Sequence, residues 1–105
     1  MTKEESITRK YFTERAKLEV KEDEIRRFTE TGQNLLDEFY SKINFLFSDY
    51  TDADMEAKQF ALNRFSMFSR EFEEKVENES HCLTKSYEQL EERFNKEIRD
   101  LSKKE

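Results

Sequence analysis

The sequence predicts an all-α protein, a long antiparallel two-helix hairpin, and three observations support this fold class. The chain has no proline and a single glycine, Gly32, among 105 residues. Turns and strand ends normally need both residue types, so their scarcity indicates long uninterrupted helices. Apolar residues recur at helical spacing through a background that is 42% charged. A cluster of turn-forming residues lies near the middle of the chain.

The first predicted helix covers about residues 3–48. Thr2 and Glu5 have the spacing of a capping box at its start. Its apolar stripe has a mean spacing of about 3.6 residues, the period of a straight amphipathic helix. The stripe consists of Ile7, Tyr11, Leu18, Ile25, Phe28, Gly32, Leu35, Phe39 and Ile43, with polar interruptions at residues 14–15 and 21–22. Gly32 on this stripe indicates either a close approach of the second helix or a kink that divides the first.

The predicted turn covers about residues 49–51, within a segment of capping and turn-forming residues from Ser48 to Asp54. The second predicted helix covers about residues 52–103, and Thr51 or Asp52 can cap its start. Its stripe also averages about 3.6 residues and consists of Phe65, Phe68, Phe72, Val76, Leu83, Tyr87, Leu90, Phe94, Ile98 and Leu101. We expect one helical-hairpin domain over residues 1–105.

The composition argues against several function classes. A net charge of −6 and a pI near 5.0 disfavour nucleic acid as a partner. No apolar run approaches the roughly 18–20 residues that cross a bilayer, and the first residues lack the apolar segment of a secretory signal, which predicts a cytoplasmic protein. His81 and the lone Cys82 are too few for a metal site. We expect no catalytic, cofactor-binding or metal-binding residues, and therefore no enzyme.

The aromatic residues point instead to association. Seven of the ten Phe lie between residues 39 and 72, more than one helix–helix seam can cover. We expect the seam to bury Phe39, Ile43, Phe65 and Phe68. Exposed aromatic and Met side chains usually mark protein interfaces. The predicted partner-binding residues are Tyr40, Phe45, Phe47, Tyr50, Leu62 and Met67; their partner is either another helical protein or a second copy in a homodimer.

The layout, a proline-free hairpin of about 100 residues with a turn at mid-chain, resembles the small helical proteins of bacterial type VII secretion. The chain lacks the Trp-x-Gly turn of the WXG-type substrates and has Tyr50 there instead. It looks more like the accessory proteins encoded beside LXG-domain toxins. That resemblance implies binding to a toxin's helical LXG domain and targeting to the type VIIb machine, with co-export as an option.

The same family uses a Tyr-x-x-x-Asp/Glu export signal. Tyr87 and Glu91 match it by spacing, as do Tyr50 and Asp54. Tyr87 also lies on the apolar stripe, so packing in the seam is the alternative role for this residue.

The expected function is therefore a non-enzymatic adaptor, a targeting factor or chaperone for a secreted helical protein. The competing hypothesis is a self-assembling structural coiled coil or helical bundle, which a sustained spacing of 3.5 residues would favour.

Overall fold

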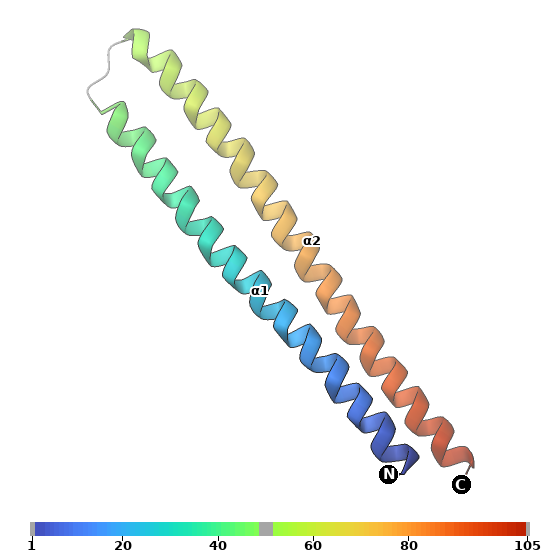
Figure 1. Ribbon diagram of the computed structural model, residues 1–105. Helices are drawn as coiled ribbons and strands as arrows, with labels where there is room; N and C mark the ends of the chain where they lie inside the picture. The colour runs from blue at the N-terminus through green and yellow to red at the C-terminus, as the bar shows by residue number, and fades with distance from the viewer. Residues whose placement is uncertain (1, 49–51, 105) are drawn as a thin grey trace. The chain divides into compact units, whose positions relative to one another are not determined.

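The computed structural model describes residues 2–48 and 52–104, which form two long α-helices (Figure 1). Helix α1 spans Lys3–Leu46 and helix α2 spans Asp52–Lys104. These two described stretches contain no strand. The all-α class is confirmed, and the predicted helix bounds are correct to within about two residues. The predicted turn, about residues 49–51, and the cap at Thr51 lie outside the described residues.

Hydrogen bonds at both ends of α1 explain its bounds. The Thr2 hydroxyl accepts a hydrogen bond from the backbone N–H of Glu5 at 3.1 Å, as the predicted capping box requires. At the other end, the backbone N–H and the hydroxyl of Ser48 both donate to the carbonyl of Phe45, at 3.3 and 2.9 Å. These bonds occupy a carbonyl that the helix end would leave without a partner and tighten the last turn. α1 therefore ends at Leu46 rather than at residue 48.

The chain clusters into two compact units. Unit 1 comprises Met1–Ile25 and Asn78–Glu105, and unit 2 comprises Arg26–Glu77. Each unit contains one segment of α1 and one of α2. The organisation as a single domain over residues 1–105 stays a prediction.

In unit 1 the helix segments run antiparallel and pack around two buried residues. Tyr11 is 7% exposed and Leu90 is 4% exposed. The Tyr11 ring stacks on Phe94 with the ring centroids 4.4 Å apart. Glu22, farther along α1, meets Tyr87, which comes earlier on α2. The opposite order of these contacts along the two helices is that of a hairpin.

Unit 2 is also an antiparallel helix pair, and aromatic rings make its contacts. Phe28 meets Phe72 with centroids 5.4 Å apart, and Phe39 meets Phe65 at 6.1 Å. Ile43, 4% exposed, is the buried hydrophobic residue among the described side chains of this unit. Phe65 and Phe72 are half-buried in these contacts, whereas Phe28 and Phe39 lie at their edge and stay exposed.

The seam of unit 2 differs from the prediction. Phe39 and Phe68 were expected to be buried, but they are 43% and 52% exposed, and Leu35, which lies on the predicted stripe, is 60% exposed. Residues next to the expected stripe are half-buried instead, among them Leu36 and Ser69. Two helices approach closely only where the facing side chains are small enough to interdigitate, so large rings are displaced to the flanks of the contact.

From Leu62 to Leu90 the half-buried and buried residues of α2 have a mean spacing of about 3.5 residues, slightly below the predicted 3.6. Every seventh residue belongs to this set, namely Leu62, Ser69, Val76, Leu83 and Leu90. Heptad spacing is typical of coiled coils and of antiparallel pairs in helical bundles. Helix pairs within one chain and helices of different copies both show this spacing. It therefore does not by itself identify self-assembly.

Gly32 marks a close approach, not a kink. α1 runs through it without a break, and its φ is not positive. The Phe72 ring occupies the space where a Cβ would stand: an ideal Cβ would lie 3.1 Å from Cδ2 of Phe72 and overlap Cε2 and Cζ. Glycine is needed here because it leaves room for the ring, not because of its backbone freedom.

We predict that Gly32→Ala destabilises the fold when the Phe72 ring is present and stabilises it when that ring is removed. In the wild-type chain the added methyl overlaps the ring at a cost of about 1–3 kcal/mol, which exceeds the gain of up to about 1 kcal/mol in helix propensity. In a Phe72→Ala background the clash is gone and Gly32→Ala should stabilise by about 1 kcal/mol. Urea unfolding of the four chains measures this, and destabilisation in both backgrounds would contradict the close approach.

We predict that Ile43→Ala lowers the free energy of unfolding by about 2–5 kcal/mol, because Ile43 is 4% exposed and its removal leaves a cavity. Phe45→Ala is the matched control two residues away. Phe45 is 79% exposed, and its truncation should change stability by no more than about 0.5 kcal/mol. Comparable losses for the two variants in chemical denaturation would be inconsistent with this seam.

Candidate partner-binding surface

Exposed apolar side chains are concentrated in unit 2. Twelve large hydrophobic residues are exposed among the described ones, and ten of them belong to unit 2. Only Phe12 and Val20 belong to unit 1. Large exposed apolar patches on soluble proteins mark interaction sites. Unit 2 is therefore the candidate binding region.

The predicted partner-binding residues divide into exposed and half-buried ones. Phe45, Met67 and Tyr40 are 79%, 52% and 47% exposed. Phe47 and Leu62 are half-buried, which is less exposed than expected of residues left outside the seam. Tyr50 lies outside the described residues. The binding role of all six residues stays a prediction.

The exposed members of this set do not form one patch. Phe45 follows the buried Ile43 by two residues, and Met67 follows Phe65 by two. Two residues turn a helix by about 200°, so each side chain points away from the neighbouring helix. Phe45 and Met67 therefore lie on opposite flanks of the helix pair. A single surface cannot include both.

One flank of α2 carries two exposed apolar residues in register. Phe60 is 64% exposed and Met67 is 52% exposed. They are seven residues apart and share one face of the helix. We call Phe60 and Met67 the outer pair. Met67 is among the predicted partner-binding residues and Phe60 is not, although the seven-residue spacing between them is visible in the sequence.

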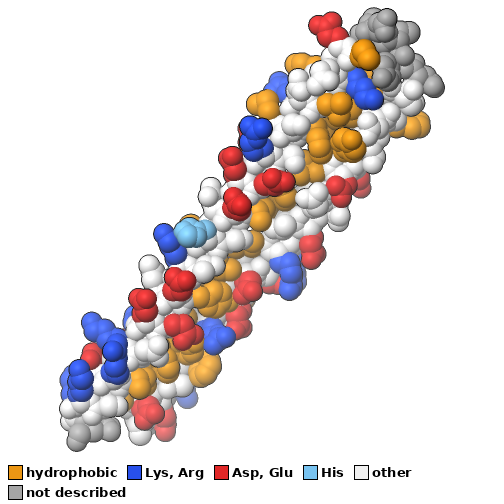
Figure 2. All heavy atoms as spheres, turned by 180° about the vertical axis from the view of Figure 1, so that it is seen from behind, with side chains coloured by type: hydrophobic (Ala, Val, Ile, Leu, Met, Phe, Trp, Pro, Cys, Tyr) orange, Lys and Arg blue, Asp and Glu red, His pale blue; other side chains and the backbone are white. Residues whose placement is uncertain are grey.

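A second apolar surface is a groove between the helices of unit 2. Its lining is entirely apolar and consists of Gly32, Leu35, Leu36, Phe39, Phe68 and Phe72. Figure 2 shows hydrophobic side chains gathered over unit 2, toward the upper end of the view.

Pairs of consecutive apolar residues in the sequence could have predicted this groove. Leu35 is followed by Leu36, and Met67 by Phe68. Consecutive residues point about 100° apart on a helix, so one line of contact cannot bury both members of such a pair.

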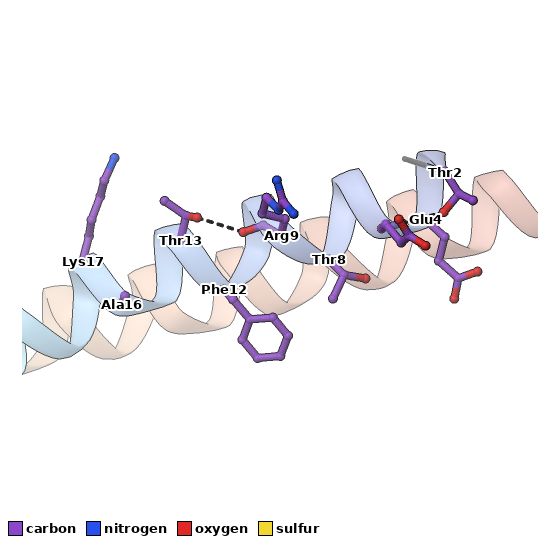
Figure 3. Close-up of a pocket in the computed structure, with 9 residues that line it drawn as sticks. Thr2, Glu4, Thr8, Arg9, Phe12, Thr13, Ala16 and Lys17 are labelled. Carbon is purple, nitrogen blue, oxygen red and sulfur yellow. Dashed lines mark hydrogen bonds between the residues drawn. The ribbon is translucent and has the colours of Figure 1, made fainter.

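Unit 1 has a broad hollow of a different kind along the first turns of α1 (Figure 3). Eight of the nine lining residues belong to α1, the ninth is the capping residue Thr2, and most are polar. Thr13 donates a hydrogen bond to the carbonyl of Arg9 at 2.9 Å, while Phe12 extends from the helix with 59% of its surface exposed. A hollow formed by one helix has no second wall to hold a ligand.

Tyr87 and Glu91, the two residues with the spacing of an export signal, both contact α1 within unit 1. The Tyr87 hydroxyl donates to a carboxylate oxygen of Glu22 at 2.9 Å. Glu91 accepts a hydrogen bond from the Tyr11 hydroxyl and lies 3.9 Å from the guanidinium of Arg15. These contacts are those of seam residues. A role as a secretion signal stays a prediction.

The polar interruptions of the first stripe have partners on α2. Glu22 binds Tyr87 and Arg15 approaches Glu91, as described above. Glu14 accepts a hydrogen bond from Arg93 at 2.6 Å. The breaks that the sequence pattern showed at residues 14–15 and 22 are therefore sites of polar contact between the helices.

These contacts raise the pKa of two tyrosines. The hydrogen bond to Glu91, and then burial, hold the pKa of Tyr11 above its ordinary value of 10.0. Burial, and then the hydrogen bond to Glu22, do the same for Tyr87. In both cases a tyrosinate would lose its donor hydrogen and face a carboxylate.

The described part of the chain has neither a candidate metal site nor a membrane-spanning helix. No group of three His, Cys, Asp or Glu side chains there could hold a metal ion. None of the helices that the described residues form has the length and apolar character to cross a membrane. The chain matches no family model, no curated protein and no solved structure.

We predict that the free energy of unfolding falls above about pH 10. The pKa values of Tyr11 and Tyr87 are higher in the folded chain than the ordinary 10.0, so the stability that their protonated forms contribute is complete below that pH. It is lost as the pH rises through the folded-state values.

Urea unfolding at increasing pH tests this expectation. Because lysines also titrate in this range, the control is the double variant Tyr11→Phe/Tyr87→Phe, which should lose less stability on the alkaline side than the wild-type chain. An identical alkaline loss in both chains would contradict the assignment.

Proposed function

We propose that the protein is a non-enzymatic adaptor that binds an amphipathic helical segment of another protein. The observation that carries this proposal is the concentration of ten exposed large hydrophobic residues in unit 2. Interfaces are enriched in aromatic and Met side chains, and those are the residue types exposed here. In the resemblance drawn from the sequence, the partner is the helical LXG domain of a secreted toxin.

We place the partner on the outer pair. Phe60 and Met67 lie one heptad apart, the spacing at which an amphipathic helix presents its own apolar residues. Both side chains point away from the intramolecular seam, so a partner can cover them without opening the hairpin. The guanidinium of Arg64, between them in sequence, has its central carbon 5.6 Å from the Phe60 ring centroid. Such stacking on an exposed ring is typical of interface arginines.

In this role the adaptor masks the apolar helices of its cargo before export. Targeting to a type VII secretion system, residence in the cytoplasm and co-export with the cargo belong to the same proposal and rest on the resemblance alone. Binding of the partner to the folded hairpin should also raise its melting temperature, since a ligand of the native state stabilises it.

We predict that the double variant Phe60→Ser/Met67→Ser weakens binding of a helical LXG domain on the order of 10²-fold, because buried aromatic anchors carry most interface energy. Its helicity should stay close to that of the wild-type chain, since both residues are more than half exposed. Titration calorimetry measures the affinity, and circular dichroism measures the helicity.

Phe12→Ser is the matched control, because Phe12 is also an exposed phenylalanine, at 59%, but belongs to unit 1. It should bind with wild-type affinity. The partner would not bind at the outer pair if Phe12→Ser weakened binding as much as the outer-pair variant does. The same would follow if the outer-pair variant bound normally.

A further inference from the structure

The groove of unit 2 remains uncovered when a partner occupies the outer pair. Phe68 lines the groove and Met67 does not. These two neighbours point about 100° apart on α2. The groove is therefore a second apolar surface that can take an occupant of its own, whether or not a partner binds the outer pair.

We infer that this occupant is a second copy of the chain. Two units 2 pack groove to groove about a two-fold axis, with α2 antiparallel to α2 of the other copy, and form a four-helix arrangement. Closed two-fold dimers are the commonest oligomers, and they require a surface that is complementary to itself. The inference does not depend on the proposed adaptor role.

The exposed apolar area has the size that a stable dimer needs. Phe28 lies seven residues before Leu35 and Leu46 seven after Phe39, so they extend the groove along α1. Phe28, Phe39, Phe68, Leu35 and Leu46 are 44%, 43%, 52%, 60% and 74% exposed. With about 150–250 Å² for an aromatic side chain and somewhat less for leucine, they expose roughly 400–500 Å². A standard interface buries about 800 Å² per partner, somewhat more than half of it apolar.

The charges along the groove do not oppose a second copy. Unit 2 as a whole carries eleven acidic and seven basic residues, so most of its faces would repel an identical chain. The groove edges carry charges of both signs, and the Lys75 ammonium also lies there, 5.2 Å from the centroid of the Phe28 ring. Glu38 and Lys42 lie close to Phe39 on α1, and Arg64 and Glu71 flank Phe68 on α2.

The edge of α2 is also complementary to itself. Arg64 precedes Phe68 by four residues and Glu71 follows it by three, so all three lie along one side of the helix. When two such edges run antiparallel and cross at Phe68, Arg64 of each copy meets Glu71 of the other. Arg64 and Glu71 are exposed, and an arginine can keep its stacking on Phe60 while its N–H groups reach a carboxylate. The opposite charges select the antiparallel orientation.

Sedimentation equilibrium of the full chain at low salt tests the inference. We expect a dimer that Phe39→Ser/Phe68→Ser converts to monomer by raising the dissociation constant on the order of 10²-fold or more. The outer-pair variant Phe60→Ser/Met67→Ser removes a similar amount of exposed apolar surface and should remain dimeric. A monomeric wild-type chain at high micromolar concentration, or an equal loss in both variants, would overturn the inference.

Charge reversal provides a second test that leaves the apolar residues in place. Glu71→Arg places like charges together twice per dimer and should weaken association by about tenfold, whereas Arg64→Glu/Glu71→Arg should restore it to within about threefold of wild type. Failure of the double variant to restore the dimer would contradict the antiparallel arrangement. If the wild-type chain is a monomer and Phe39→Ser/Phe68→Ser abolishes cargo binding, the groove binds the cargo and not a second copy.

Discussion

Two helices have only one line of contact, and this constraint governs the distribution of side chains in the hairpin. Among the described residues, Tyr11, Ile43 and Leu90 are the buried hydrophobic ones. A chain with ten Phe and four Tyr cannot place so many rings along one narrow seam. The surplus lies on the flanks, where it remains exposed to solvent. The surface chemistry of the protein follows from what its seam cannot accommodate.

The two units meet this constraint differently. Unit 1 completes its seam with polar contacts, in which Tyr11 and Tyr87 donate to Glu91 and Glu22. Few large hydrophobic side chains are exposed there. Unit 2 makes its helix contacts with aromatic rings, and Gly32 provides the space that the Phe72 ring occupies. Among the described residues, unit 1 therefore exposes little large apolar surface, whereas unit 2 exposes most of it.

Unit 2 has two separate apolar surfaces, the outer pair and the groove, and each of the two proposals uses one of them. The outer pair lies on a flank that faces away from the seam, and the groove lies between the helices. Residues on these surfaces are nearly adjacent in sequence, as Met67 and Phe68 show, but the helix directs them to different sides. In the two proposals the protein associates with itself through the groove and leaves the outer pair accessible to a cargo helix. Oligomeric state and cargo binding then become separable properties.

The sequence by itself determined the fold class, the helix bounds to within about two residues and the region of the chain where apolar residues exceed one seam. It did so because proline, glycine and capping residues act locally, and their absence or presence is visible in the composition. The role of Gly32 stayed open between a kink and a close approach, since the choice depends on a ring forty residues away.

Only the tertiary structure decided which side chains the seam holds. Leu35, Phe39 and Phe68 had the right period and residue type for burial, yet they flank the contact, while Phe47 and Leu62 are half-buried. A shift of one residue turns a helix by about 100°, and the facing helix determines that rotation through the fit of its own side chains. Likewise, the sequence pattern shows Glu14 and Glu22 only as polar breaks in the apolar stripe, because their partners, Arg93 and Tyr87, lie on the other helix. Periodicity along one helix carries no information about the side chains across from it.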